Sequence, residues 1–331
     1  MRSENTGNAN YGVSANGTLA YTVGSAAART LVWVDRRGRE EAINIPSRAY
    51  VYAQLSPDGK LVALDSRDEE NDIWIWDFAR ETLQRLTFDP GFNRGPLWAP
   101  DGRRLAFSRQ IEGTEEVYWQ AADGSGTAAP LTMGSKAAMV PGDFSPDGAR
   151  LLYQPSNPPE DIWMISLDGP PTSGMPLLDG PANERGATVS PDGRWLAYES
   201  DESGQFEIYV RPFPEVDTGR RQISTGGGTR PRWSRDGREL FYFVPAGGPF
   251  SLGALMAVTV ERGSNFAFGR AEMLFQGNYP APNAGRLLYD VSLDGQRFLM
   301  IRNAAEAESA PPHIVVVENW TEELKRLVPT N

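Results

Sequence analysis

Short apolar runs with a period of two recur along the chain, each following a turn rich in proline, aspartate and glycine. Leu196 and Tyr198, for example, follow the turn Ser190-Pro191-Asp192-Gly193. Proline presets φ for a turn, aspartate hydrogen-bonds its own backbone, and glycine takes the left-handed conformation that closes a hairpin. An alternating apolar run after such a turn predicts the second strand of a β-hairpin.

This turn recurs at a regular interval. Its glycines are Gly17, Gly59, Gly102, Gly148, Gly193, Gly237 and Gly295, so the first six are spaced by 42 to 46 residues and the last two by 58. A period in the forties is typical of proteins built from stacked or ring-forming repeats. The spacing leaves no room for an inserted domain between the second and sixth units.

Each unit offers four strands. A further apolar run follows the hairpin, as in residues 72–76, and a shorter one follows that, as in residues 84–87. With the strand before the turn, these make the four-stranded blade of a β-propeller. We predict an all-β propeller with seven blades, one for each turn; a six-bladed ring with one accessory hairpin is the alternative.

The two ends of the chain bear on how the ring closes. We expect a flexible segment at residues 1–10, a single propeller over residues 11–320 and a short helical tail at residues 321–331. Propellers are usually closed by a strand from the opposite terminus, and residues 1–10 have no strand pattern. The last unit shows three strands, so the sequence predicts an imperfectly closed last blade, as in a fragment of a longer protein.

Several stretches resemble known bacterial propellers. They are Leu-Val-Trp-Val-Asp-Arg-Arg-Gly-Arg-Glu at 31–40, Asp-Glu-Glu-Asn-Asp-Ile-Trp at 68–74, Tyr-Val-Arg-Pro-Phe-Pro at 209–214 and Trp-Thr-Glu-Glu-Leu-Lys-Arg-Leu at 320–327. The repeats resemble TolB-like and WD-repeat-like modules and, more narrowly, the C-terminal extracytoplasmic half of multidomain bacterial serine/threonine kinases. The sequence contains none of the kinase motifs, so the resemblance implies a propeller rather than a kinase. It also implies a periplasmic location, although the first residues lack the apolar core of a signal peptide.

Composition removes several classes of function. The net charge of −11 argues against a general positive field that would attract nucleic acid. The absence of cysteine excludes disulfides and thiolate metal sites. No run of eighteen apolar residues is present, so no membrane span is predicted. We expect a monomer whose partner is a protein or a small anionic ligand.

The repeat register points to a candidate site on the axis. Alternation along the strand before each turn places one set of side chains toward the channel. This set includes Gln54, Asp143, Arg232 and Asp290. Arg230 lies two residues further from its turn, and Arg94, Glu184, Arg185 and Arg286 come nearer the mouth. In one interpretation Arg94, Arg230 and Arg232 bind a carboxylate or phosphate bidentately. In the other, these arginines pair with Asp143, Glu184 and Asp290.

Two functions of different classes follow. The first is a binding or scaffold module, in which no cofactor is expected. The second is a calcium-dependent hydrolase of lactones, aryl esters or phosphotriesters, whose channel ion would take oxygen ligands from Asp143, Asp290 and Glu184. The arginines in the same ring favour binding over hydrolysis. The lone His313 cannot make a histidine-rich zinc site.

One more acidic position recurs outside the channel. An aspartate or glutamate precedes the third strand in four units, as Asp72, Glu116, Asp161 and Glu207. Such acids could bind calcium, but no loop matches a full calcium-binding motif. We interpret them as acids that stabilise turns.

Overall fold

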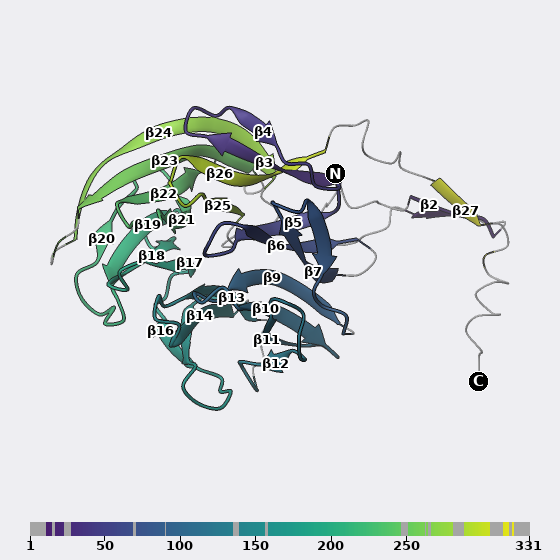
Figure 1. Cartoon of the computed structure of the whole chain (residues 1–331), viewed down its shortest axis with the longest axis horizontal. Helices are drawn as coiled ribbons and strands as arrows, with labels where there is room; N and C mark the ends of the chain where they lie inside the picture. The colour runs from purple at the N-terminus through teal and green to yellow at the C-terminus, as the bar shows by residue number, and fades with distance from the viewer. Residues whose placement is uncertain are drawn as a thin grey trace. The chain divides into compact units, whose positions relative to one another are not determined.

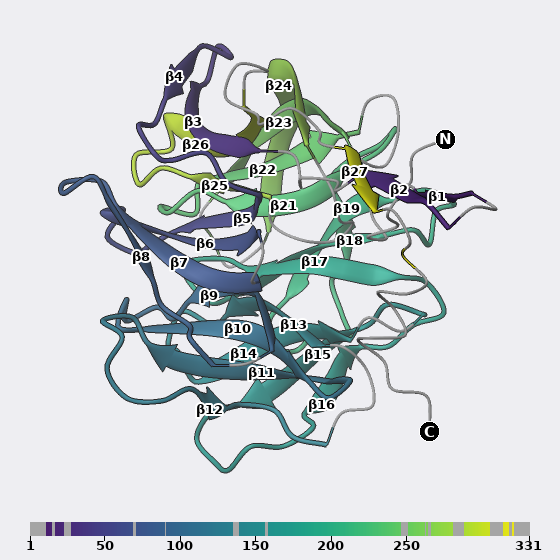
Figure 2. The ribbon, with the colours of Figure 1, turned by 90° about the vertical axis from the view of Figure 1, so that its right-hand side faces the viewer.

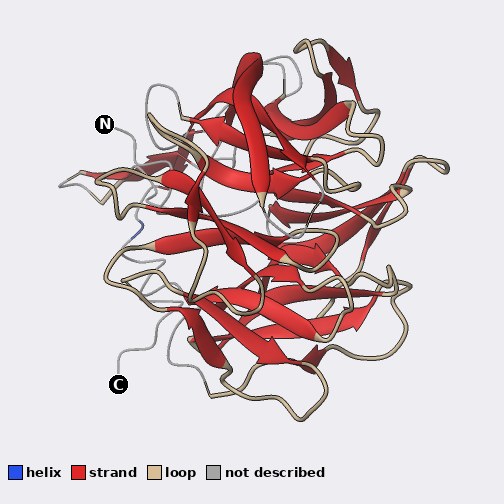
Figure 3. Cartoon of the chain, turned by 90° about the vertical axis from the view of Figure 1, so that its left-hand side faces the viewer, coloured by secondary structure: helices blue, strands red, loops and turns tan. Residues whose placement is uncertain are grey.

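The structure is a computed structural model that describes residues 11–14, 17–22, 28–68, 71–89, 91–134, 139–155, 158–245, 251–261, 263, 266–280, 288–304, 314–317 and 320. The chain divides into two compact units, Arg29–Asn303 and the paired ends Met1–Ala28 with Ala304–Asn331. The named elements of the described residues are all strands (Figure 3), and the single residue Trp320 is helical. The predicted helical tail at residues 321–331 lies outside the described residues.

The larger unit is a β-propeller of six four-stranded antiparallel blades (Figure 2). Blade 1 comprises β5 (Tyr50–Leu55), β6 (Leu61–Arg67), β7 (Asn71–Asp77) and β8 (Thr82–Arg85). Blade 2 comprises β9 (Phe92–Trp98), β10 (Arg104–Ile111), β11 (Thr114–Ala121) and β12 (Ala129–Pro130). Blade 3 comprises β13 (Met139–Phe144), β14 (Arg150–Pro155), β15 (Ile162–Ser166) and β16 (Met175–Leu178).

The remaining blades follow the same order from the axis outward, except that the sixth is assembled from both ends of the unit. Blade 4 comprises β17 (Glu184–Val189), β18 (Trp195–Ser200), β19 (Glu207–Pro212) and β20 (Arg221–Gln222). Blade 5 comprises β21 (Thr229–Trp233), β22 (Glu239–Val244), β23 (Ser251–Glu261) and β24 (Ala267–Pro280). Blade 6 comprises β25 (Tyr289–Val291), β26 (Arg297–Asn303), β3 (Arg29–Asp35) and β4 (Glu40–Ala42).

Blade 6 closes the ring and corrects two predictions. β3 pairs with β26 over seven residues, from Arg29 opposite Asn303 to Asp35 opposite Arg297 (Figure 1). The N-terminal part of the unit therefore supplies the two outer strands and the C-terminal part the two inner strands. Seven blades and an imperfectly closed last blade were wrong predictions, because β3 completes the seventh hairpin rather than the first.

The first hairpin belongs to the smaller unit. There, β1 (Tyr11–Val13) and β2 (Leu19–Thr22) form the hairpin, and β2 also pairs with β27 (Ile314–Val317). This is the accessory hairpin of the six-blade alternative. β27 thus extends this small sheet instead of a seventh blade.

The repeated turn sequence explains why the hairpins form in register. In blade 1, Ser56 Oγ donates to Asp58 Oδ1 at 2.7 Å and accepts the Leu61 N–H at 3.0 Å, while Gly59 has φ 70°. The serines at 145, 190, 234 and 292 bind their own turns in the same way. The turn aspartates are therefore structural, as expected from the sequence.

Apolar layers between neighbouring blades form the core. One layer joins Phe241 and Phe243 of blade 5 to Phe298 and Met300 of blade 6, all of them fully buried. Because each blade buries its faces against its neighbours, the ring is stabilised only when it is closed.

The outer strand of blade 5 departs from the others. β24 has 14 residues, whereas the outer strands of the other blades have two to four. Its pairing with β23 shifts register three times, each time with the extra residue on β24. Such bulges bend a strand and protect an open sheet edge from pairing with another chain. Among the described residues, no helix is long and apolar enough to cross a membrane.

Candidate functional site

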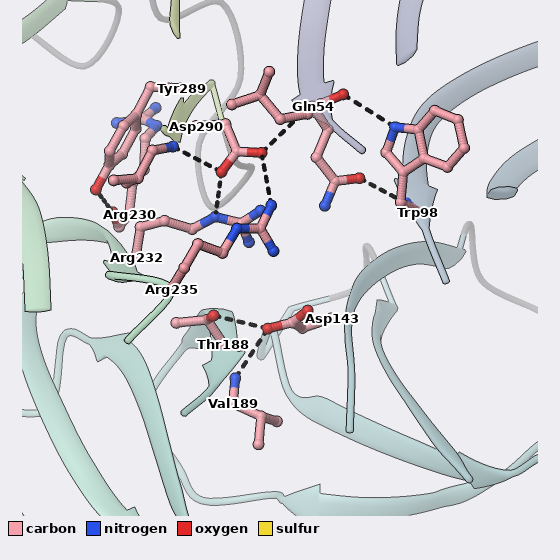
Figure 4. A network of polar contacts seen from close by, with 12 residues as sticks. Gln54, Trp98, Asp143, Thr188, Val189, Arg230, Arg232, Arg235, Tyr289 and Asp290 are labelled. Atoms are coloured by element: carbon pink, nitrogen blue, oxygen red, sulfur yellow. Dashed lines mark hydrogen bonds and ion pairs between the residues drawn. The ribbon is translucent and has the colours of Figure 1, made fainter. Parts of the chain in front are cut away.

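Side chains two residues before each turn form a ring around the propeller axis. These six positions are Gln54, Leu97, Asp143, Thr188, Arg232 and Asp290, one from each inner strand. Three of them accept a backbone N–H from the next blade (Figure 4): Gln54 Oε1 from Trp98 at 2.7 Å, Asp143 Oδ2 from Val189 at 3.0 Å and Asp290 Oδ2 from Leu55 at 2.9 Å. The acceptors at these register positions therefore join neighbouring blades.

Asp290 is the most heavily engaged member of this ring. Its Oδ1 accepts Arg232 Nε at 3.1 Å and the Val291 N–H at 2.8 Å, and Arg235 lies 4.0 Å from Oδ2 (Figure 4). Asp290 and Arg232 are only 1% and 7% exposed. Burial alone would raise the pKa of Asp290, but Arg232 and Arg235 hold that pKa below its ordinary value. The guanidinium of Arg232 is thus occupied by an acid within the ring.

The pKa of Asp143 is displaced in the opposite direction from that of Asp290. Its Oδ2 also accepts the Thr188 hydroxyl at 2.8 Å (Figure 4). Burial raises the pKa of this carboxyl above its ordinary value, and Arg232 only partly opposes the effect. Two acids of one ring therefore have pKa values displaced in opposite directions, because Arg232 bonds directly to Asp290.

The arginines expected at the mouth are paired with acids that sequence reasoning missed. Arg94 Nε donates to Glu115 Oε1 at 2.8 Å, and its Nη2 makes a second contact with the same carboxylate. Arg185 lies 3.1 Å from Glu160 and 3.3 Å from Glu199. Glu115 and Glu199 come from the third and second strands of their blades, and no periodic signal in the sequence links them to the inner strands.

Arg230 adopts an unusual backbone conformation. It has φ 57° at the register position where Gly95 and Gly186 have φ 62° and 64° in their blades. Its side chain is 4% exposed, and its carbonyl accepts the Tyr289 hydroxyl at 3.0 Å. Burial lowers the pKa of Arg230, and Glu199 opposes this effect. A β-carbon in this left-handed conformation costs roughly 1–2 kcal/mol, so the surrounding contacts hold the backbone there.

We expect Arg230→Ala to be less stable than Arg230→Gly by about 1 kcal/mol. Both variants remove the charge beside Glu199, but only glycine also removes the β-carbon from the left-handed conformation. Urea denaturation of the two variants isolates this backbone effect, since each serves as the other's control. Equal midpoints would show that the backbone at residue 230 relaxes without cost.

Glu184 lies apart from the arginines expected at the mouth. The charges that act on Glu184 are Asp161, Arg211 and Glu202 rather than the arginines of the mouth. Within the described residues, no three acidic or histidine side chains are gathered closely enough to hold a metal ion. His313 lies outside the described residues. The structure thus does not bring Glu184 together with Asp143 and Asp290.

A hollow in the channel wall was not anticipated. Its walls include Tyr52 of blade 1 and the backbone at Gly95-Pro96, Pro141-Gly142 and Gly186-Ala187 of blades 2 to 4. Its cavity volume is about 50 Å³. Three inner strands shift register at these points, so their backbone leaves the regular ladder. We call this feature the channel hollow; the recurrence of glycine and proline in one register could have predicted it.

Comparisons with known proteins agree with this fold. Residues 18–157 match the family model described as the TolB beta propeller domain. An uncharacterised protein of Agrobacterium fabrum, Atu1656, is 27% identical over 203 residues, which cover 57% of this chain and 67% of that protein. A structure from Agrobacterium tumefaciens described as TolB has a TM-score of 0.68 at 19% identity and covers 84% of this chain and 99% of its own.

Over residues 18–157 the chain is thus similar to the TolB propeller domain. TolB from Acinetobacter baumannii gives a TM-score of 0.55 at 14% identity, covering 89% of this chain and 80% of that one. At these identities the likeness to the solved structures concerns the fold alone. The paired arginines and the channel hollow are the features that a functional proposal can use.

Proposed function

We propose that this TolB-like propeller is a binding module whose ligand site is the channel hollow. The observation that carries the proposal is the chemistry of the wall. Small residues and proline bring the backbone of three inner strands to the surface of the hollow, beside Tyr52 and Leu97. At a bulge, backbone N–H and C=O groups that do not bond to the neighbouring strand can hydrogen-bond to a polar ligand. The apolar side chains can bury the apolar part of a ligand. A short uncharged segment of a partner protein has both features.

The charged residues around the channel favour this ligand over an anion. Glu115 occupies Arg94, and Asp290 occupies Arg232. An anion would have to displace a buried carboxylate, which exchanges one charged hydrogen bond for another with little net gain. Binding of a small carboxylate or phosphate by Arg94, Arg230 and Arg232 stays a prediction. No contact among the described residues favours the calcium-dependent hydrolase.

Filling the channel hollow should abolish ligand binding. Peptides that bind the parent protein would first be selected from a library of short random sequences. Calorimetry would then compare the affinity of these peptides for the parent protein with their affinity for Gly142→Leu. Gly142 lines the hollow, and a β-carbon there meets only ordinary van der Waals contacts, the nearest atom being Leu152 O at 3.4 Å. The added side chain therefore enters the hollow without a clash at the backbone. We expect affinity to fall at least about tenfold, or roughly 1.4 kcal/mol.

Gly169→Leu is the matched control. Gly169 is an exposed glycine of the same blade with nothing within 4 Å of its β-carbon position, so peptide affinity should be unchanged. Peptides that bind Gly142→Leu as tightly as the parent protein would place the site elsewhere. Binding of simple anions that is lost in Arg232→Ala would instead support the arginine clamp.

A further inference from the structure

One residue in each of blades 1 to 5 lies at the outer corner of the apolar layer shared with the preceding blade. It follows the third strand and donates its N–H to the residue after the turn glycine, as Phe78 does to Lys60 at 3.2 Å and Ala122 to Arg103 at 2.8 Å. The same bond identifies Leu167, Phe213 and Val260 in blades 3 to 5. Four of these five side chains are large and apolar, so the alanine of blade 2 departs from the repeat.

A cleft opens beside Ala122, between the outer part of blade 1 and the loop that follows β11 of blade 2. Its volume is about 300 Å³, against about 50 Å³ for the channel hollow. Ile75 and Leu86 of blade 1, which are 9% and 4% exposed, line it together with Ala122. This volume is at the lower end of the range found for ligand pockets. We call this feature the outer cleft.

The outer cleft adjoins a strand edge that can accept another strand. Thr82 and Gln84 of β8 line the cleft, and no described strand pairs with the outer edge of β8. β8 pairs with β7 over four residues without a register shift, whereas β16 and β24 shift register and the other outer strands have two or three residues. Leu86 donates its N–H inward to Ile73 at 2.8 Å, so by alternation the N–H and C=O of Leu83 point away from β7. A regular edge of this kind can bind an extended peptide.

The charge left over at the rim of the outer cleft is negative. Arg80 lines the cleft and is paired with Asp77 at 3.3 Å. Asp123 lines the opposite side, and no described arginine or lysine forms an ion pair with it. Hydrogen bonds from the side chain and the N–H of Ser125 hold the pKa of the Asp123 carboxyl below its ordinary value. Asp123 is therefore ionised at neutral pH and would attract a cation of a ligand.

We propose that the outer cleft binds an extended segment of a partner protein, which pairs with the edge of β8 and inserts an aromatic or branched apolar side chain beside Ala122. That side chain takes the place that Phe78 and Phe213 fill in their own blades. Side chains two residues apart lie on one face of a strand, so a lysine or arginine at that spacing can approach Asp123. Backbone pairing supplies affinity, and the cleft supplies selectivity. The proposal does not depend on what the channel hollow binds.

Calorimetry with short blocked peptides tests the apolar contact. The probe is acetyl-Thr-Phe-Thr-Arg-Thr-amide, whose phenylalanine and arginine share one face. We expect a dissociation constant below about 1 mM, and binding at least about tenfold weaker when alanine replaces the phenylalanine. Ala122→Phe fills the corner from within, as in blades 1 and 4, and should weaken binding at least about tenfold without lowering the melting temperature. Ala129→Phe, at an exposed position of the same blade, is the matched control and should bind like the parent protein.

A charge-neutral variant tests the contact with Asp123. Asp123→Asn should weaken binding of the probe about two- to fivefold, the range expected for an exposed ion pair. It should not change binding of the analogue in which glutamine replaces the arginine. Asp168→Asn is the control, because Asp168 follows Leu167 in blade 3 as Asp123 follows Ala122 in blade 2. Equal losses for the probe and its glutamine analogue would contradict the ion pair.

Hydrogen exchange locates the backbone contact. A saturating concentration of the probe should slow exchange of the Leu83 amide at least about tenfold and leave the Gln84 amide, which points toward β7, unchanged. Unchanged exchange at Leu83, equal affinity for Ala122→Phe and the parent protein, or no binding at about 1 mM would each overturn the proposal. So would loss of binding in Gly142→Leu with binding retained in Ala122→Phe, because the probe would then occupy the channel hollow.

Discussion

Replacing Asp290 with alanine should lower the free energy of unfolding by about 3–5 kcal/mol. Asp290 is 1% exposed and binds Arg232, which is 7% exposed, so its removal leaves a buried cation without its acid. The variant also loses the acceptor for the Leu55 N–H, a bond between blades 6 and 1. Urea denaturation measures the loss. Asp294→Ala, in an exposed turn of the same blade, is the control and should cost about 1 kcal/mol.

The pH dependence of this loss has a definite sign. Because the folded pKa of Asp290 lies below its ordinary value, its contribution is complete above about pH 4 and disappears as pH falls through the folded pKa. The stability of the parent protein and of Asp290→Ala should therefore converge in acid. The double variant Asp290→Ala, Arg232→Met should recover much of the loss, since it no longer buries an unpaired charge. If the double variant were as unstable as Asp290→Ala, the bond to Leu55 rather than the ion pair would dominate.

The turn sequence explains why the ring of axial side chains could be predicted. Each Asp-Gly turn fixes the register of the strand before it, so counting back from the turn places Gln54, Asp143, Arg232 and Asp290 at equivalent positions. Local hydrogen bonds determine that register, and local sequence encodes them. The same logic predicted four-stranded blades. It says nothing about which strands meet when the ring closes.

The partners of the arginines and the channel hollow needed three-dimensional information. Glu115 reaches Arg94 from 21 residues away, across the strands of one blade, and Glu199 reaches Arg185 from the neighbouring strand after a register shift. A bulge moves every later side chain by one position, so simple alternation fails beyond it. The hollow arises at three such bulges. Glycine and proline at 95–96 and 141–142 were visible in the sequence, but their shared place in the ring was not interpreted.

The replacement of a hydroxyl by Asp179 illustrates a different limit. The recurrent acids were recognised as structural, and in blades 1, 2 and 4 they bind a hydroxyl. Their partners lie 15 to 17 residues further along the chain, at a spacing that varies with the loop between the third and fourth strands. Only the strand pairing shows that blade 3 has Asp179, an exposed residue, at the register position of those buried hydroxyls. A departure from a repeat becomes visible once its register is known.

Removing β3 and β4 should prevent cooperative folding of the propeller. A chain of residues 29–303 retains all six blades, whereas a chain of residues 43–303 lacks the outer half of blade 6. Leu31, Val32 and Val34 of β3 are fully buried, and each contributes about 1.5–3 kcal/mol. Their sum is comparable to the whole net stability of a typical domain, about 5–15 kcal/mol. Deletion also exposes the edge of β26, which pairs with β3 over seven residues.

Calorimetry of the two chains gives the measurement. We expect residues 29–303 to show one cooperative transition and residues 43–303 to show none, with the transition restored by adding a peptide of residues 29–42. That peptide is the critical control, because it separates loss of the closing strands from nonspecific damage by truncation. A cooperative transition of residues 43–303 at the temperature of the longer chain would mean that five complete blades and two inner strands suffice. The closing strands would then add order at the edge of blade 6 without holding the ring together.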